Sequence, residues 1–228
     1  MTFSNEKNRL VAVFFDLILT FRHNSDNIYP EINLYGGNSM KEYYEIDIKG
    51  LKRDLPLCPL SDKLYIGAFV IFGDVELTKH CAAELIKIMD KDYDYIITAE
   101  SKGIPLVYEM CRQIGQNKYM LARKAPKLYM KNVLKCEVRS ITTARQQTLY
   151  LDGADAEMMR GKRIVIVDDV ISTGESLHAL EELVLQAGGI IADRMAILAE
   201  GDAYDRKDIK ALQYLPLFDE NGDPIPKN

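Results

Sequence analysis

Apolar and polar positions follow two different spacings along the chain. Between residues 74 and 89 the apolar residues recur at the spacing of one helix face, and Asp74 is a candidate N-cap at its start. Residues 93–98 form a short apolar run rich in β-prone residues, and helical spacing returns over residues 105–115. This part of the chain therefore predicts a helix, a strand and a helix, in that order.

The alternation continues toward the C-terminus. Apolar runs predict strands at residues 119–122, 163–167 and 192–199, and residues 177–186 predict a helix closed by the glycine pair that follows. Strands that alternate with helices favour an α/β fold, a mostly parallel sheet with helices on both faces. Ligands of such sheets bind at the carboxyl ends of the strands, so we expect the loops after the strands to carry the chemistry.

The composition is that of an ordinary globular protein, with 47% hydrophobic and 28% charged residues in a chain of 228. We expect an N-terminal extension over residues 1–60, one core over residues 61–218 and a loose polar tail over residues 219–228. The net charge of -5 argues against a protein that binds nucleic acid or a membrane surface through bulk positive charge. An apolar run at residues 10–21 contains Asp16 and is too short to span a membrane.

The four cysteines, Cys58, Cys81, Cys111 and Cys136, lie more than 20 residues apart. No pair among them has the spacing of a zinc site, a redox-active dithiol or a local disulfide. We therefore predict reduced thiols in a cytoplasmic protein.

The segment from residue 124 to residue 152 fits neither spacing, and its polar, β-prone residues predict a hairpin or a mobile flap. Between Lys118 and Arg145 the chain carries eight Lys or Arg residues and one acidic residue, Glu137. A solvated basic face would explain this cluster. Its place beside two strand-end loops favours an anion site instead.

Residues 164–176, IVIVDDVISTGES, carry the strongest functional signal. Four apolar residues predict a buried strand with Asp168 and Asp169 at its carboxyl end, and a loop of small residues leads into a helix. The free N–H groups and the positive dipole end of such a helix can hold a phosphate. The alternative is that Ser172 and Glu175 form a capping box that only begins the helix. A capping box leaves two carboxylates at the end of an apolar strand unexplained, because uncompensated charge is costly there.

This string resembles the signature of the type I phosphoribosyltransferases, which has four apolar residues, two acidic residues and a loop ending in TGGT or similar. The resemblance implies that Asp168 and Asp169 bind the 2- and 3-hydroxyls of phosphoribosyl diphosphate (PRPP). It also implies that Val170 and the loop after it contact PRPP, and that the loop wraps the 5-phosphate. The loop residues are Ser172, Thr173, Gly174, Glu175 and Ser176, and glycine is usual in the family where Glu175 stands.

Residues 99–103 (AESKG) follow a predicted strand. The family keeps its pyrophosphate loop at this place, a short turn that exposes backbone N–H groups, so the resemblance implies that Ser101, Lys102 and Gly103 bind PRPP. An ordinary turn between a strand and a helix has the same pattern, so this segment is a weak signal by itself.

Residues 123–128 (RKAPKL) resemble the RKxxKL element of the adenine phosphoribosyltransferases. This resemblance implies PRPP-binding roles for Arg123 and Lys124 and a catalytic role for Lys127. The three landmarks stand in the family's order along the chain, which makes the chain most similar to the adenine, or purine, branch.

The resemblance implies a purine phosphoribosyltransferase of nucleotide salvage, with adenine as the favoured base. The N-terminal extension would form a small hood over that base. Tyr65, Phe69 and Val170 are the candidate base-binding residues, and a place in the core is the alternative for the two aromatic rings.

The flap departs from the adenine branch at one place. Adenine phosphoribosyltransferases usually carry a Glu-Tyr pair in the flap, and this chain has Thr143 and Ala144 there. Arg145, Gln146 and Gln147 are candidates to replace the pair, and a different base is the alternative.

The implied reaction is attack of a base nitrogen on C1 of PRPP, with inversion and loss of pyrophosphate. Mg²⁺ would bridge substrate oxygens, with Asp168 and Asp169 as candidate ligands, and the family implies a homodimer. A non-catalytic PRPP sensor on the same fold is the main alternative. Residues 1–60 hold seven Lys or Arg against eight Asp or Glu, which is unfavourable for DNA binding. A dinucleotide-dependent oxidoreductase is excluded because no GxGxxG follows a strand.

Overall fold

The computed structural model describes residues 40–138 and 147–226. The apolar run at residues 10–21 and the flap positions 143–146 lie outside these residues. Within the described ranges, no helix is long and apolar enough to cross a membrane. All four cysteines are free thiols, as their spacing predicts.

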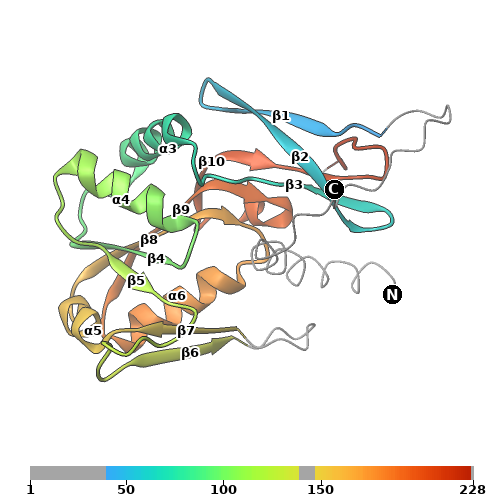
Figure 1. Ribbon diagram of the computed structural model, residues 1–228. Coiled ribbons are helices and arrows are strands. Elements are labelled where there is room, and N and C mark those ends of the chain that lie inside the picture. Colours follow the sequence, from blue (N-terminus) through green and yellow to red (C-terminus); the bar gives the residue numbers. More distant parts are fainter. Residues whose placement is uncertain (1–39, 139–146, 227–228) are drawn as a thin grey trace.

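A five-stranded parallel sheet forms the centre of the molecule (Figure 1), in the order β10-β9-β8-β4-β5. Its strands are, in chain order, β4 (Tyr95–Ala99), β5 (Met120–Ala122), β8 (Arg163–Ile171), β9 (Ile190–Glu200) and β10 (Lys210–Leu215). The predicted α/β fold class is confirmed. β8 continues beyond its predicted end at Val167 and therefore contains the acidic pair.

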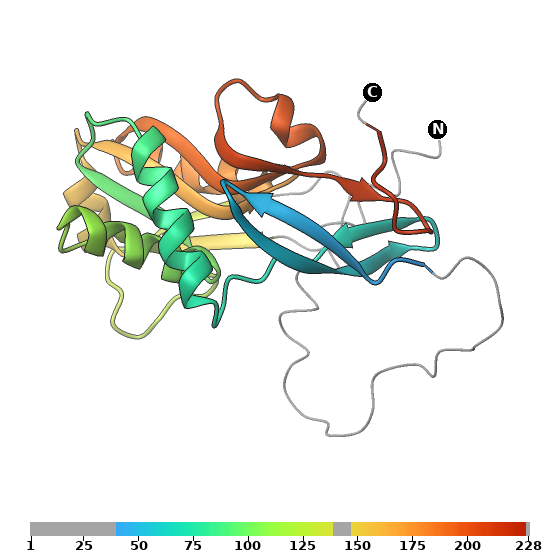
Figure 2. The same ribbon diagram turned by 90° about the horizontal axis from the view of Figure 1, so that it is seen from above.

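Helices cover both faces of the parallel sheet, as Figures 1 and 2 show. α3 (Val75–Ile88) and α4 (Gly103–Ile114) pack on one face, and α5 (Gly153–Met159) and α6 (Glu175–Gln186) pack on the other. Each face therefore has an apolar core of its own.

Strand β8 contributes to both cores. Val165 and Val167 belong to the core on the α3–α4 side, and Ile164 and Ile166 belong to the core on the α5–α6 side. The uniformly apolar run of the sequence is thus two alternating rows, one for each face, as expected for a strand buried on both sides.

Local side-chain and backbone chemistry sets the helix ends. The Asp74 carboxylate accepts a hydrogen bond from the Leu77 N–H at 2.9 Å, which confirms Asp74 as the N-cap of α3. α4 ends at Gly115, whose φ of 75° lies in the left-handed region that favours glycine. α4 begins at Gly103, before the predicted start at Pro105, so the loop glycine belongs to its first turn.

A smaller antiparallel sheet has the order β1-β2-β3-β11. Its strands are β1 (Tyr43–Ile48), β2 (Leu51–Ser61), β3 (Leu64–Gly67) and β11 (Leu217–Phe218). β10 leads almost directly into β11, so this sheet adjoins the carboxyl ends of the parallel strands (Figure 2). The expected boundary between residues 60 and 61 falls inside the pairing of β2 with β3. The domain limits and the role of a hood stay predictions.

The segment after β11 differs from the loose tail that the sequence predicts. The Asp219 carboxylate accepts hydrogen bonds from the N–H groups of Asn221 and Asp223, both at 2.9 Å. The Ile225 N–H donates to the Leu217 carbonyl at 2.8 Å. Because the aspartate satisfies the backbone of its own turn, residues 219–226 fold back along β11.

The predicted insertion contains an antiparallel hairpin of β6 (Leu134–Val138) and β7 (Gln147–Leu151). Cys136, Leu149 and Leu151 are buried in the core that includes α6. Packing therefore fixes the base of the hairpin, and its tip at residues 139–146 lies outside the described residues. The function of the hairpin as a flap stays a prediction.

Candidate functional site

β4 and β8 are neighbours in the parallel sheet, and the chain leaves them in opposite directions. After β4 it crosses through α4 to β5, and after β8 it crosses through α6 to β9 on the other side. Open α/β sheets bind ligands at such a switch point, outside the carboxyl ends of the two strands. The candidate site therefore lies between the loop after β4 and the loop after β8.

Asp168 and Asp169 are consecutive residues near the carboxyl end of β8. Asp168 is partly exposed, whereas Asp169 is only 7% exposed. The Asp169 N–H donates to Asp168 Oδ1 at 2.9 Å. The two carboxylates are thus not equivalent, and Asp168 is the more accessible of the pair.

Burial dominates the electrostatics of the acidic pair. It holds the pKa of Asp168 well above its usual range, with the Asp169 carboxylate adding to the rise and Lys102 opposing it. The Lys102 ammonium lies 3.4 Å from Asp169 Oδ2. Among the described residues that oxygen has no hydrogen-bond partner. The pair therefore has unused capacity to accept hydrogen bonds from hydroxyl groups or to contact a cation.

Lys102, a predicted PRPP-binding residue, points into the protein. Its side chain is 11% exposed, and its ammonium donates to the Phe69 carbonyl at 3.1 Å in addition to its ion pair with Asp169. The charge of Lys102 therefore compensates the acidic pair in this structure and does not project into solvent.

At Gly103 the backbone of the loop after β4 comes close to the side chains of Thr98 and Asp168. The peptide bond between Glu100 and Ser101 in this loop is cis. A Cβ at residue 103 would lie 1.9 Å from Thr98 Oγ1 and 3.6 Å from Asp168 Oδ1. Thr98 is fully buried, so its hydroxyl has little room to move. Packing therefore requires glycine beside Asp168 at this position.

Glu100 holds the predicted basic element beside the same loop. Its carboxylate accepts a hydrogen bond from the Lys124 N–H at 2.9 Å and lies 3.2 Å from Arg123 Nε. Burial lowers the pKa of Lys124, and Asp168 and Glu100 act in the opposite direction. The structure thus brings Arg123 and Lys124 to the switch point.

Lys127 is placed differently from its two basic neighbours in the sequence. Its backbone N–H donates to the Met130 sulfur at 3.2 Å, and its residue is partly exposed. In the described part of the chain its side chain has neither an ion pair nor a hydrogen bond. The predicted catalytic role of Lys127 stays a prediction.

The loop after β8 leaves the start of α6 open. The N-cap is Gly174, with φ of 81°, and no side chain of the described residues hydrogen bonds to this end of the helix. The capping box that Ser172 and Glu175 could form is therefore absent, which rules out this alternative. The N–H groups of the first turn remain available for a phosphate.

A pocket of about 300 Å³ opens beside this loop. Its lining residues come from the loop, from the 3-10 helix η1 (Gly201–Asp205) with its two flanking residues, and from β11: Ser172, Thr173, Glu200, Gly201, Asp202, Ala203, Arg206 and Leu217. Glu200 and Arg206 are not among the residues predicted from the sequence. Glu200 ends an apolar run, as Asp168 does, and the same signal could have found it.

Glu200 is a second buried carboxyl group at the site. It is 2% exposed, and its oxygens have no hydrogen-bond partner in the described residues. Burial is the main cause that raises the pKa of Glu200 to about 7, with Asp169 adding to the rise and Lys102 opposing it. The Lys102 ammonium therefore acts on two buried carboxyl groups.

The candidate base-binding residues do not meet at this pocket. Tyr65 lies in β3 of the small sheet, and Val170 is partly buried against the core on the α3–α4 side. Phe69 is 1% exposed and belongs to that core. A ring buried to this degree matches the core alternative, because stacking on a base would require Phe69 to leave the core.

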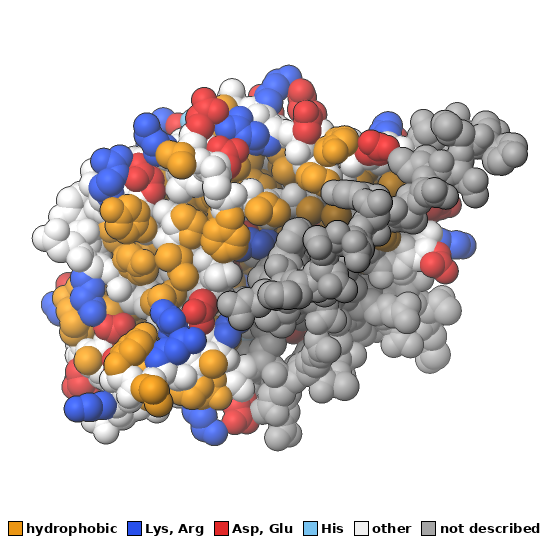
Figure 3. All heavy atoms as spheres, viewed as in Figure 1, with side chains coloured by type: hydrophobic (Ala, Val, Ile, Leu, Met, Phe, Trp, Pro, Cys, Tyr) orange, Lys and Arg blue, Asp and Glu red, His pale blue; other side chains and the backbone are white. Residues whose placement is uncertain are grey.

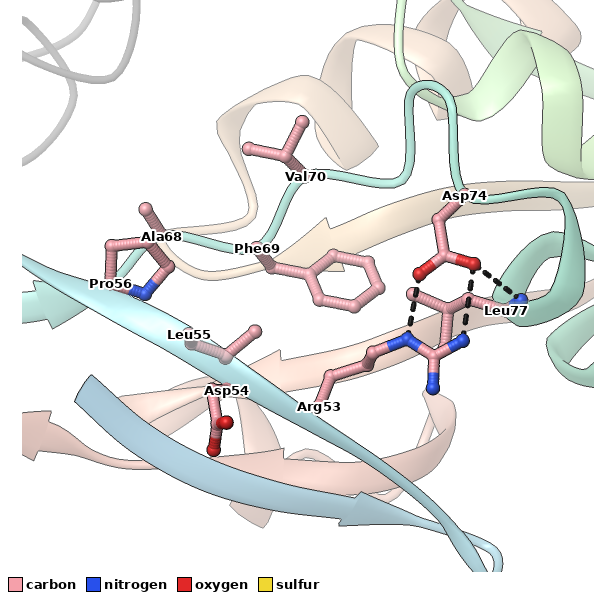
Figure 4. A pocket seen from close by; sticks show the side chains of 9 residues that line it. All are labelled: Arg53, Asp54, Leu55, Pro56, Ala68, Phe69, Val70, Asp74 and Leu77. Carbon is pink, nitrogen blue, oxygen red and sulfur yellow. Dashed lines mark hydrogen bonds and ion pairs between the residues drawn. The ribbon is translucent and has the colours of Figure 1, made fainter.

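Figure 4 shows a second pocket, of about 200 Å³, which Phe69 lines together with β2 and the start of α3. Arg53 and Asp74 form an ion pair at this pocket, with Arg53 Nε 2.7 Å from Asp74 Oδ2 and Nη2 3.2 Å from Oδ1. This two-point contact raises the pKa of Arg53 and lowers the pKa of Asp74. The pocket is thus bounded by a satisfied ion pair that attaches the small sheet to α3.

The acidic pair could contribute to a Mg²⁺ site only together with other ligands. The described residues contain no group of three or more His, Cys, Asp or Glu side chains that could hold a metal ion. Mg²⁺ commonly takes one or two carboxylates and completes its shell with water and substrate phosphates. A partly exposed Asp168 and an Asp169 oxygen that accepts no hydrogen bond from the described residues fit that set of ligands.

Comparisons with known proteins agree with this geometry. The family model for the phosphoribosyl transferase domain matches residues 75–221. The hypoxanthine/guanine phosphoribosyltransferases of Methanosarcina acetivorans and Methanococcus maripaludis (strain S2) are both 34% identical to the chain, over 131 and 162 residues. The matches cover 58% and 68% of this chain, and 65% and 83% of the relatives. The first match thus spans slightly less than two thirds of that relative.

Solved adenine phosphoribosyltransferases have a similar fold. The protein of Thermoanaerobacter pseudethanolicus has a TM-score of 0.54 at 22% identity, and the match covers 76% of this chain and 95% of that one. The protein of Rhodothermus marinus has a TM-score of 0.55 at 17% identity, with 76% and 94% covered. At these identities the likeness concerns the fold alone.

Proposed function

Because the chain belongs to the phosphoribosyltransferase family, we propose that it transfers the phosphoribosyl group of PRPP to a purine base and releases pyrophosphate. The observation that carries this proposal is at the switch point. There the acidic pair of β8 is followed, after a short loop, by a helix whose N-terminus no side chain of the described residues caps. This combination suits a sugar phosphate, since carboxylates accept hydrogen bonds from sugar hydroxyls and free N–H groups bind phosphate.

Each part of the site has a task in this reaction. Asp168 accepts hydrogen bonds from the ribose hydroxyls, and the first turn of α6 binds the 5-phosphate. The loop that contains Gly103 holds the pyrophosphate, with C1 between the two loops. Positioning both reactants in line for attack by the base nitrogen lowers the entropic part of the barrier.

Charge on the leaving group is balanced by basic residues at the switch point. Lys124 lies close enough to Asp168 to be influenced by its charge, and Arg123 is held beside it by Glu100. A bound Mg²⁺ would neutralise negative charge on the leaving pyrophosphate, and Asp168 and Asp169 are the residues that would hold it. The β6–β7 hairpin would cover the reactants and exclude water, which competes with the base as nucleophile.

Two observations bear on the identity of the base. The RKxxKL element at residues 123–128 favours adenine, which is our first candidate. The names of the relatives at 34% identity favour hypoxanthine and guanine, which form the second candidate pair. All three are purines, so the proposal of purine salvage is common to both.

The test is release of pyrophosphate from PRPP and Mg²⁺, with adenine, hypoxanthine, guanine, xanthine, uracil and orotate offered separately. We expect release that depends on a purine. Release with a pyrimidine alone would contradict the proposal. No release with any base, while calorimetry shows PRPP binding, would replace the enzyme with a non-catalytic PRPP sensor.

We propose in addition that the protein is a homodimer. Large apolar side chains are exposed on the segment that leads into α3, at the first residue of α3 and on α4, including Val70, Phe72, Val75 and Tyr108. Figure 3 shows hydrophobic side chains gathered on this face. Contiguous exposed apolar surface of this kind commonly marks an interaction site. Sedimentation equilibrium checks the proposal, and a monomer at all concentrations would contradict it.

A further inference from the structure

Arg206 lies over the start of α6. It follows η1 in the connection from β9 to β10, and its Nη1 atom would lie 2.8 Å from a Cβ built on Gly174. Gly174 is the residue from which the first turn of α6 begins. The guanidinium therefore contacts the loop at the point where the free N–H groups of the helix start.

Asp208 fixes the orientation of this guanidinium. Arg206 Nε lies 3.1 Å from Asp208 Oδ1, and Nη2 lies 2.7 Å from Oδ2. A planar guanidinium uses one edge in such a two-point contact with a carboxylate. Nη1, which is turned toward Gly174, has no hydrogen-bond partner in the described part of the chain.

The N-terminus of a helix carries partial positive charge and by itself disfavours a cation at this position, so Asp208 and Glu181 provide the negative charge that stabilises Arg206 here. Arg160 provides the comparison. It lies against Gly188 beyond the opposite end of α6, and Glu157 accepts from its Nε at 3.3 Å and from its Nη2 at 2.8 Å. The helix dipole favours a cation there. Arg206 has the same kind of carboxylate contact at the opposite end, where an anion bound to the helix N-terminus would lie beside its guanidinium.

The charges around the pocket beside the loop after β8 support this reading. Among the described residues that line it, Arg206 is the one basic residue, and Glu200 and Asp202 are the acidic ones. The acidic residues belong to the β9 end and to η1, whereas Arg206 contacts the loop itself. The anion would therefore lie against the loop, and donor groups of the same ligand would face Glu200 and Asp202.

We propose that Arg206 binds the 5-phosphate of PRPP and of the nucleotide product, with Nη1 as a charged donor that complements the N–H groups of α6. This inference rests on the proposed function, which puts that phosphate in the loop of residues 172–176. It adds the connection from β9 to β10 to the phosphate site and supplies a positive charge that the loop itself lacks.

The experiment compares Arg206→Gln with the matched control Arg160→Gln. Calorimetry measures binding of ribose 5-phosphate, which occupies the phosphate loop, and of pyrophosphate, which occupies the loop after β4. We expect Arg206→Gln to weaken ribose 5-phosphate binding by about 10- to 100-fold, as for loss of one charged hydrogen bond, and to leave pyrophosphate binding unchanged. Arg160→Gln should match the unsubstituted protein with both ligands. Thermal melts establish that each variant is folded.

Three results would overturn the inference. Unchanged ribose 5-phosphate binding in Arg206→Gln would remove Arg206 from the phosphate site while the proposed function stands. An equal loss of affinity for both ligands would mean that Arg206 acts on the fold or on the electrostatic potential of the whole site and not on one phosphate. Absence of binding of both PRPP and ribose 5-phosphate to the unsubstituted protein would overturn the proposed function, and this inference with it.

Discussion

The loops after β4 and β8 follow neighbouring strands of one sheet, but the hydrogen-bonding groups of the two loops find their partners in different ways. In the loop after β4, Glu100 holds the basic element, Lys102 bonds to the Phe69 carbonyl, and Gly103 packs against a buried hydroxyl. In the loop after β8, the described residues provide no side-chain cap for α6. The first loop is therefore completed by the protein before a ligand arrives, whereas the second is completed by the ligand.

The largest expected effect concerns the acidic pair at which the two loops meet. Asp168→Asn combined with Asp169→Asn should lower the turnover of PRPP by roughly 10³-fold, the size of effect seen when one key charge-stabilising group is lost. The fold should persist with a lower stability, because Lys102 loses its ion-pair partner Asp169. Steady-state pyrophosphate release and a thermal melt measure the two effects. Asp92→Asn, at an exposed carboxylate beside the start of β8, is the control, and full turnover in the double variant would contradict the assignment.

Glu200 is a buried carboxyl group whose pKa depends on Lys102, in the loop after β4, and on Asp169, near the end of β8. It therefore tests how the two sides of the site act on one group. Its pKa is about 7 in the folded protein and 4.5 ordinarily, so the folded protein retains a proton that the unfolded chain loses as pH rises. Stability contributed by this group therefore falls as pH rises from about 4.5 to 7. Glu200→Gln should raise the free energy of unfolding by about 3 kcal/mol at about pH 8 and by little at about pH 4.5. Urea unfolding at both pH values checks this, and an equal gain at both would contradict it.

The two loop glycines give a direct comparison of rigidity. Gly103→Ala places a methyl group against Thr98 Oγ1 and should lower the free energy of unfolding by about 2 kcal/mol. Gly174→Ala meets only the end of a flexible arginine and should cost about 1 kcal/mol for its positive φ. Thr98→Ala added to Gly103→Ala should recover part of the first loss. If Gly174→Ala costs more in urea unfolding, the loop after β8 is the more rigid one.

The smallest effects concern the two arginines at the ends of α6. In the ligand-free protein Arg160→Gln should slightly lower the free energy of unfolding, and Arg206→Gln should leave it unchanged or slightly raise it. The difference should shrink in high salt, because screening weakens both interactions with the helix dipole. Urea unfolding at low and high salt measures it. A clear loss of stability in Arg206→Gln would mean that the ligand-free protein already uses this charge.

The fold around the switch point could be predicted because its signals are local. Apolar spacing and the Asp74 cap placed α3, and the run before Asp168 placed β8 with its neighbours on both faces. The order of strands, helices and loops followed from the same alternation. The acidic pair and the loop of residues 172–176 were visible as a contiguous string.

What the sequence could not supply depends on contacts between distant residues. The direction of Lys102 is determined by the Phe69 carbonyl and by Asp169, which are far from it in sequence. Burial of Phe69 depends on β2 and α3, and the place of Arg206 depends on the turn after β9. The capping box fails for a local reason, because Gly174 adopts a left-handed conformation and becomes the N-cap itself.

The pairing of β11 with β3 has a consequence for the order of assembly on the ribosome. Phe218 pairs with Tyr65, so the small sheet joins segments from opposite ends of the described chain. β1, β2 and β3 can pair as soon as they emerge, but the edge of β3 stays open until the last strand has been made. Exposed strand edges are prone to mispairing with other chains. Nascent chains that stall before β11 should therefore be the aggregation-prone species of this protein.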